Sequence, residues 1–202
     1  MSVDKFNPRL IVLTIIMLVV AAIRIPNAAQ LTPWAQFTPI GAIALFGGAY
    51  FTKKWKAVVL SISILLISDL VINTMVFHNR YGIMYSGWYW VYFTFVIINF
   101  IGSWIIKSVT IKKVLLAAVI ATIFHGLLLD FIVWAGGGID VRTLLPLSRD
   151  FSGLLQSYAQ GLPFAKNFLE GTIVYGAVMF GVYECINKWH PFKHGPSTIL
   201  ID

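Results

Sequence analysis

The chain has 202 residues, of which 58% are hydrophobic and 11% are charged, and its formal net charge is +7. This apolar content excludes a disordered chain and a soluble domain, because the chain has too few polar side chains to cover a water-exposed surface. The basic residues lie between apolar runs, so they indicate membrane topology and not a nucleic-acid surface. We therefore predict an all-α fold, a polytopic integral membrane protein whose single transmembrane domain covers residues 1–202.

Six apolar runs approach the length of about 20 residues that a helix needs to cross a hydrocarbon core of about 30 Å. They predict transmembrane helices at about residues 10–25, 39–51, 57–77, 88–106, 114–135 and 168–187. The second run is short, but Thr38 and Pro39 make a favourable helix start, and its Gly and Ala residues permit close helix packing. An alternative for the first run is a signal peptide cleaved near residues 27–29, which would leave five helices.

Basic residues fall unevenly on the two sides of the membrane that six spans define. One side carries ten of them, at Lys5, Arg9, Lys53, Lys54, Lys56, Lys107, Lys112, Lys113, Lys188 and Lys193. The other side carries five, at Arg24, Arg80, Arg142, Arg149 and Lys166. Because cytoplasmic loops carry the excess of Lys and Arg, this bias predicts that both termini lie in the cytoplasm.

The longest connection, residues 136–167, is predicted to be an outward-facing lid loop. Three glycines make its start flexible, and Pro163 marks its end. Between them, apolar residues at helical spacing predict a short amphipathic helix, with Asp150 as its N-terminal cap. This helix would lie over the outer mouth of the bundle, or alternatively rest on the lipid surface with no gating role.

Ionisable and amide side chains inside the spans predict a pocket that opens to the outside, because such groups usually face protein or a water-filled cavity. Asp69 and Asn73 are one helical turn apart and would form a polar wall. Trp134 lies one turn outward from Asp130, and a ring above a carboxylate suits a planar ligand. The predicted substrate-binding residues are Asp69, Asn73, Asn99, His125, Asp130, Trp134, Gln156, Tyr158 and Glu170.

These polar side chains also have a structural interpretation. Asp69 could pair with Arg24 or Arg80, while Asn99 and His125 could bridge neighbouring helices. In that case the chain would be a non-catalytic membrane scaffold or assembly subunit. A cavity between the helices would distinguish binding from scaffolding.

Motifs for catalysis and for metal binding are absent from the sequence, which contains no HExxH, GxSxG, P-loop or GxGxxG pattern. His190 and His194 straddle a proline, which prevents them from sharing a helical face. We therefore predict no catalytic residues, no metal and no cofactor, and we expect that the chain is not an enzyme. An intramembrane enzyme that uses His125 and Asp130 on a lipid-like substrate remains an alternative.

Four stretches of sequence carry a resemblance to a known family. They are FTPIGAIALFGGAYF at 37–51, SDLVIN at 68–73, GLLQSYAQGLPFAKNFLEG at 153–171 and FGVYE at 180–184. Together they resemble an uncharacterised bacterial family of six-helix membrane proteins assigned to transport. That family is in turn similar to the S components, the substrate-binding subunits of energy-coupling factor (ECF) vitamin transporters.

The resemblance implies a multi-pass protein of the bacterial cytoplasmic (inner) membrane that captures a small vitamin-like compound, such as a corrinoid or its precursor. Its implied partners are this ligand, the lipid bilayer, a transmembrane coupling subunit and two cytosolic ATPases, with no nucleic acid. Many S components dock the coupling subunit through a run of alanines on the first helix. This chain departs from that pattern, since it has only Ala21 and Ala22 near the outer end of that helix.

Overall fold

A computed structural model describes residues 8–24, 37–80 and 82–189 of the chain. Its helices are α1 (Pro8–Ala22), α3 (Ile40–Tyr50), α4 (Lys54–Val71), α5 (Trp88–Ile105), α6 (Ile111–Ala135) and α7 (Phe151–Trp189), and α4 continues into a π-helical turn, η1 (Ile72–Val76). The all-α class is thus confirmed for the described part of the chain. The possible cleavage region at residues 27–29, together with Lys5, His190, Lys193 and His194, lies outside the described residues.

Four of these helices are long and apolar enough to cross a membrane: α4 with its π-helical turn, α5, α6 and α7. The other two, α1 and α3, are apolar but have only 15 and 11 residues. At 1.5 Å per residue, α3 reaches across only about half of a hydrocarbon core of about 30 Å. The described helices therefore identify a membrane protein, with four segments of spanning length.

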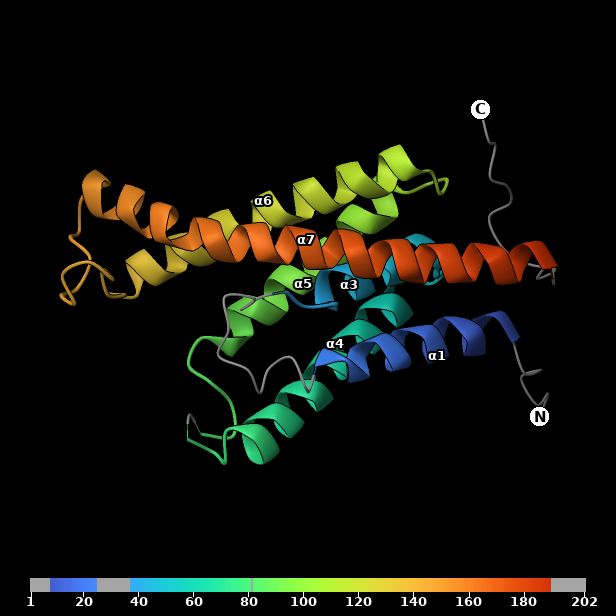
Figure 1. The fold of residues 1–202 in the computed structure, drawn as a ribbon, viewed down its shortest axis with the longest axis horizontal. Coiled ribbons are helices and arrows are strands. Elements are labelled where there is room, and N and C mark those ends of the chain that lie inside the picture. Colours follow the sequence, from blue (N-terminus) through green and yellow to red (C-terminus); the bar gives the residue numbers. More distant parts are fainter. Residues whose placement is uncertain (1–7, 25–36, 81, 190–202) are drawn as a thin grey trace.

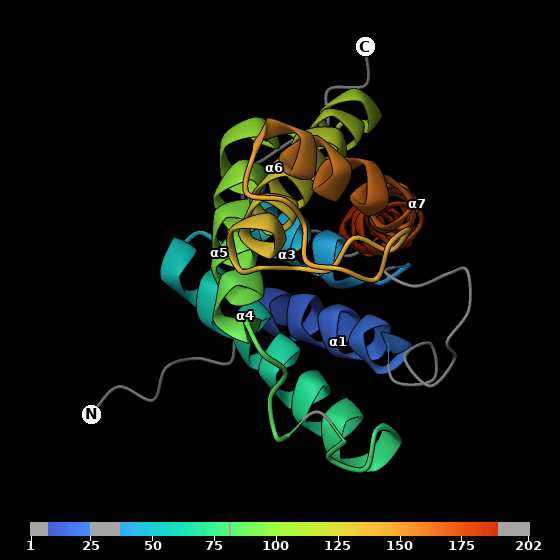
Figure 2. The same ribbon diagram turned by 90° about the vertical axis from the view of Figure 1, so that its left-hand side faces the viewer.

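The short helix α3 lies at the centre of the bundle. It contacts all five of the other described helices. These surround it in a closed ring, in which α1 contacts α4, α4 contacts α5, α5 contacts α6, α6 contacts α7 and α7 contacts α1 (Figures 1 and 2). Ten of its eleven residues are buried, which explains why its sequence is apolar on every side and rich in Gly and Ala. The sequence-based expectation of a short, tightly packed helix is confirmed.

Glycines allow α3 and α5 to cross with their backbones in contact. A Cβ atom on Gly48 would overlap the backbone carbonyl of Asn99, and one on Gly102 would lie 2.5 Å from the carbonyl oxygen of Leu45. Any other residue at these two positions would force the helices apart.

The last helix differs from its sequence-based prediction. α7 is a single helix of 39 residues that runs through Pro163, so the region predicted as a lid loop at 136–167 is a loop only from 136 to 150. The proline ring lies on an exposed side of α7, where the cost is one missing backbone hydrogen bond. Asp150 caps the helix as predicted, because its Oδ1 accepts a hydrogen bond of 2.8 Å from the Gly153 amide.

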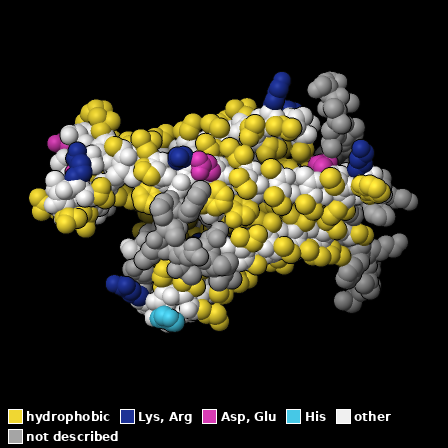
Figure 3. All heavy atoms as spheres, viewed as in Figure 1, with side chains coloured by type: hydrophobic (Ala, Val, Ile, Leu, Met, Phe, Trp, Pro, Cys, Tyr) yellow, Lys and Arg dark blue, Asp and Glu magenta, His cyan; other side chains and the backbone are white. Residues whose placement is uncertain are grey.

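The start of α1 and the end of α7 meet at one end of the bundle, where Arg9 donates hydrogen bonds to the Tyr183 hydroxyl at 3.0 Å and to the Tyr50 carbonyl at 2.8 Å. We call this the basic end, because α4 and α6 also begin here with lysines at 53, 54, 56, 112 and 113 (Figure 1). Between the two ends, apolar side chains cover most of the face shown in Figure 3. Such a surface suits contact with lipid.

Candidate functional site

The antiparallel helices α6 and α7 form a half-open cavity of about 310 Å³ between them. Its lining comes from these two helices alone: His125, Gly126, Leu129, Asp130, Val133, Ser157, Gln160, Gly161, Phe164, Ala165 and Phe168. The cavity lies in the half of both helices that is remote from the basic end. Its volume reaches the range of about 300–1,000 Å³ that is typical of small-molecule sites.

Asp130 supplies the one carboxylate of this lining. Within the described ranges, its two carboxylate oxygens accept no hydrogen bond and form no ion pair. Gly161 makes room for the carboxylate, because a Cβ atom at this position would overlap it. The backbone carbonyl of Asp130 accepts a hydrogen bond of 2.8 Å from the Ser157 hydroxyl, which fixes α7 against α6 beside the cavity.

His125 is buried, and the hydrogen bonds of Thr94 favour one tautomer of its ring. The Thr94 hydroxyl donates its single hydrogen to the Val91 carbonyl at 2.6 Å, so at 2.9 Å from His125 Nδ1 it acts as the acceptor. The histidine therefore carries hydrogen on Nδ1, and in the neutral ring Nε2 keeps its lone pair. The ring stacks on Phe168, with centroids 4.5 Å apart and an interplanar angle of 16°.

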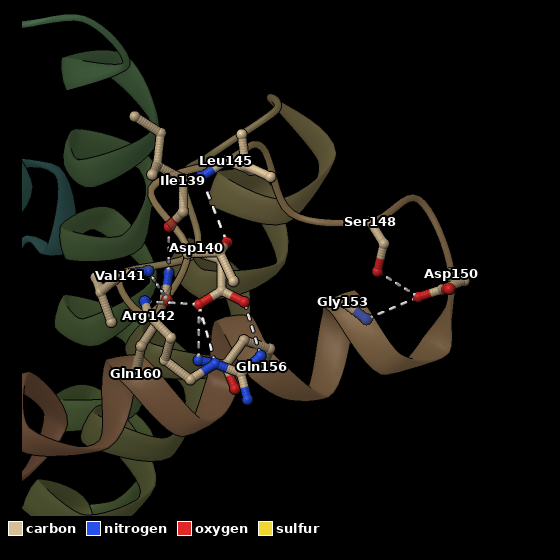
Figure 4. A network of polar contacts seen from close by, with 11 residues as sticks. Ile139, Asp140, Val141, Arg142, Leu145, Ser148, Asp150, Gly153, Gln156 and Gln160 are labelled. Atoms are coloured by element: carbon tan, nitrogen blue, oxygen red, sulfur yellow. Dashed lines mark hydrogen bonds and ion pairs between the residues drawn. The ribbon is translucent and has the colours of Figure 1, made fainter.

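A tight hairpin at residues 138–147 packs on α7 beside the cavity (Figure 4). Gln160 links the two, because its Oε1 accepts a hydrogen bond from the Val141 amide at 3.3 Å and its Nε2 donates to the Ile139 carbonyl at 3.0 Å. Inside the hairpin, Asp140 and Arg142 form an ion pair of 2.7 Å. Hydrogen bonds from Arg142 lower the pKa of Asp140 from its ordinary value of 3.8 to about 2.

Gln156, predicted as a lid residue, and Trp134, predicted as a pocket residue, contact this hairpin region and are not part of the cavity lining. Gln156 donates from Nε2 to Asp140 Oδ1 at 3.4 Å, and the Trp134 indole donates to the Ser148 carbonyl at 2.8 Å. Tyr158, which was predicted with them, is half-buried on α7. Trp134 thus secures the start of α7 to the end of α6.

Asp69 and Asn73 lie in a separate polar cluster formed by Arg24, α4 and α5. The Asp69 side chain is 2% exposed and pairs with Arg24 at 2.5 Å, and the Tyr92 hydroxyl donates to its Oδ2 at 3.0 Å. Asn73 donates from Nδ2 to the backbone carbonyl of Asp69. The structural alternative for Asp69, a pair with Arg24, is the arrangement present.

Asn99 and Glu170 also lie away from the cavity. The Ser61 hydroxyl donates to Asn99 Oδ1 at 3.3 Å, which joins α4 to α5. Glu170 is 41% exposed and lies 3.7 Å from Lys166, one turn away on the same helix. Of the nine predicted binding residues, the α6–α7 cavity brings together His125 and Asp130.

Sequence reasoning missed all six lining residues of α7: Ser157, Gln160, Gly161, Phe164, Ala165 and Phe168. Their spacing of three and four residues follows one face of a helix, but the signal is recognisable only if the helix continues through Pro163. Among the described residues, no group of three or more His, Cys, Asp or Glu side chains could hold a metal ion.

These features define a class: an all-helical membrane protein with a cavity of small-molecule size between two of its long helices. The chain belongs to a family of unknown function, DUF6580, whose model matches residues 4–194. No curated protein and no solved structure matches the chain.

Proposed function

We propose that this chain is the substrate-capture subunit of an uptake system, which binds a small vitamin-like compound in the α6–α7 cavity. The observation that carries the proposal is the Asp130 carboxylate, which lines a cavity of about 310 Å³ and has no partner in the described part of the chain. A carboxylate that is half withdrawn from water without a partner is costly unless a ligand satisfies it.

The position of the cavity fits capture from outside. It lies remote from the basic end, and the positive-inside rule assigns the basic end to the cytoplasm of a bacterial inner-membrane protein. The 138–147 hairpin holds Gln160 at the cavity wall and would act as the lid, in place of the longer loop expected from the sequence. Lids of this kind open on the timescale of microseconds to milliseconds.

Capture alone does not move a substrate, and the sequence holds no nucleotide-binding motif. The proposal therefore includes a transmembrane coupling subunit and cytosolic ATPases, in line with the resemblance to ECF S components. Six transmembrane helices belong to the same proposal, with α1 and α3 completing the count as short, tilted or partly inserted segments.

The test compares three forms of the protein, each purified gently from the membrane of its own host and measured by native mass spectrometry. In Gly126→Leu the new side chain projects into the cavity, since a Cβ atom there meets only Ala165, at 3.7 Å. Gly181→Leu is the matched control, because a Cβ atom there has no neighbour within 4 Å. We expect a retained small molecule in the wild type and in Gly181→Leu, and its loss in Gly126→Leu.

Thermal unfolding of the three forms shows whether Gly126→Leu still folds. Equal retention by all three folded forms would refute the cavity as the capture site. If the wild type retains nothing, uptake by host cells decides: a deletion strain complemented equally by wild type and Gly126→Leu would count against the proposal.

A second candidate function is a scaffold that holds other membrane subunits. The observation in its favour is that three polar pairs join separate elements of the bundle: Arg24 with Asp69, Ser61 with Asn99, and Thr94 with His125. Of these six residues, His125 lines the cavity and the other five do not. Partner subunits that co-purify equally with wild type and Gly126→Leu, with no small molecule in either, would favour the scaffold.

A further inference from the structure

Most polar atoms of the α6–α7 cavity that can still form a hydrogen bond are acceptors. This restricts the chemistry of the ligand. The Asp130 carboxylate offers two acceptor oxygens. Ser157 has committed its only hydrogen to the Asp130 carbonyl, so its remaining capacity is that of an acceptor. The neutral His125 ring offers the lone pair of Nε2, since Nδ1 carries its hydrogen toward Thr94.

Donors are scarce in the same lining. It contains no Lys and no Arg, and the nearby Lys166 extends toward Glu170 on α7. Gln160 carries the one amide side chain of the lining: its oxygen accepts from the Val141 amide and one of its two N–H hydrogens goes to the Ile139 carbonyl, which leaves one N–H as a donor. A ligand that brings hydrogen-bond acceptors or negative charge would thus meet acceptors and a carboxylate.

We infer that the cavity takes an organic cation, in which a protonated amine lies against Asp130 and a flat apolar part lies against Phe164 and Phe168. This inference rests on the proposed capture function and names its substrate class. An ammonium group has three donors and no acceptor, so it complements a lining whose remaining polar capacity is mainly that of acceptors, with the Asp130 carboxylate as its charged partner. The aromatic side chains add an apolar wall that also attracts cations.

An inorganic cation fits the lining less well. Sodium or calcium is bound by several oxygens that converge at short range, whereas most of the surface here comes from apolar side chains such as Leu129, Val133 and Phe164. A volume of about 310 Å³ exceeds the need of a single metal ion and suits a molecule of roughly ten to twenty heavy atoms.

The experiment uses three probes with one ring system and three charges: tryptamine as the cation, tryptophol as the neutral alcohol and indole-3-acetate as the anion. Equilibrium dialysis against the detergent-solubilised full chain gives their affinities. We expect tryptamine to bind at least about tenfold more tightly than tryptophol, a difference of about 1.4 kcal/mol, and indole-3-acetate to bind most weakly. Asp130→Asn should remove this preference.

Glu170→Gln is the matched control, because Glu170 is a half-exposed carboxylate of α7 outside the cavity lining. We expect it to bind tryptamine as the wild type does. The amine assignment is overturned if tryptamine fails to bind, if Asp130→Asn leaves its affinity unchanged, or if sodium chloride displaces it where choline chloride of equal ionic strength does not.

The two proposals fail in different ways. A neutral or acidic host molecule that is retained by the wild type and lost in Gly126→Leu would keep the capture function and refute the amine class. Tryptamine binding that is insensitive to Gly126→Leu would place the amine outside the cavity and refute the amine class, whereas the capture function is refuted by equal retention of the host molecule in all three forms.

Discussion

Gly48 in α3 faces the backbone carbonyl of Asn99 in α5 with no space for a methyl group between them. The contact is reciprocal, because Gly102 of α5 faces the backbone of Leu45 in the same way. The position of α3 is thus set by backbone atoms, which cannot rotate away as side chains can. Since α3 contacts every helix of the ring, a shift at this crossing displaces the whole bundle.

Replacing Gly48 by Ala should therefore lower the free energy of unfolding by about 1–3 kcal/mol or more, the usual cost of overpacking. Thermal unfolding in detergent measures the change. Gly181→Ala is the control, and we expect it to remain within about 0.5 kcal/mol of the wild type because a Cβ atom there meets open space. Equal unfolding temperatures for Gly48→Ala and wild type would contradict the observed crossing.

Asp69 and Asp130 should separate stability from binding. Asp69→Asn leaves the Arg24 guanidinium without its buried partner and should destabilise the fold by about 3 kcal/mol, while tryptamine affinity stays unchanged. Asp130→Asn should weaken tryptamine binding and leave the stability of the fold unchanged, because the Asp130 carboxylate has no partner in the described part of the chain. If Asp69→Asn weakened binding while the fold kept its stability, Asp69 would belong to the pocket, as the sequence-based hypothesis held.

The 138–147 hairpin should loosen in acid. Hydrogen bonds from Arg142 hold the pKa of Asp140 at about 2, below its ordinary 3.8, so the charged form stabilises the hairpin fully above about pH 4 and this stabilisation is lost as the pH falls toward 2. Hydrogen exchange of residues 138–147, corrected for intrinsic rates, should rise over this range.

In Asp140→Asn the same amides should exchange faster at neutral pH and show little further change in acid. The first turn of α7 is followed separately, because hydrogen bonds from Gly153 and Ser148 also lower the pKa of its cap, Asp150. A hairpin with the same protection at pH 5 and pH 2 would show that the Asp140–Arg142 pair contributes nothing to its order.

Thr94 should act on ligand binding through His125. Thr94→Val removes the acceptor for the Nδ1 hydrogen, so the imidazole no longer has one preferred tautomer, and tryptamine affinity should fall by roughly three- to tenfold. Thr94→Ser keeps the hydroxyl and should restore the affinity. The ring-nitrogen NMR shifts of His125 should report a single Nδ1–H form in the wild type and in Thr94→Ser, and a mixture in Thr94→Val.

Orientation in the membrane is testable with single cysteines, because Cys185 is the one cysteine of the chain. In a Cys185→Ser background, a membrane-impermeant maleimide on intact cells should label Leu144→Cys, whose parent side chain is 77% exposed at the hairpin tip. Lys188→Cys at the basic end should react only after the membrane is broken. The opposite labelling pattern would reverse the assignment of inside and outside.

Helix positions were predictable where apolar length decides them. The predicted spans 57–77, 88–106 and 114–135 differ from α4 with its π-helical turn, α5 and α6 by at most three residues at either end. The full length of the last helix was not predictable, because Pro163 and the polar residues around it follow the pattern of a loop. Packing against α6 holds this segment helical, and a local sequence pattern does not contain that contact.

The site was predictable only in part, for the same reason. Asp130 and His125 were identifiable because ionisable groups are costly inside a span. The partner of Asp69 could not be predicted, because it depends on whether the fold brings Arg24 or Arg80 near. The partner of His125 could not be predicted either, because Thr94 is an ordinary residue in a transmembrane segment. Such pairings follow from the register of α5 against α6 and of Arg24 against α4.

The enclosed position of α3 has a consequence for how the chain is made. α3 emerges early from the ribosome, but its neighbour α7 lies far along the chain, since Gly41 faces Phe168 and Thr172. At roughly 5–20 residues per second, synthesis of the intervening segment takes on the order of ten seconds. During that interval a helix with no surface built for lipid has no complete set of neighbours, so assembly of this protein must finish after translation reaches its last helix.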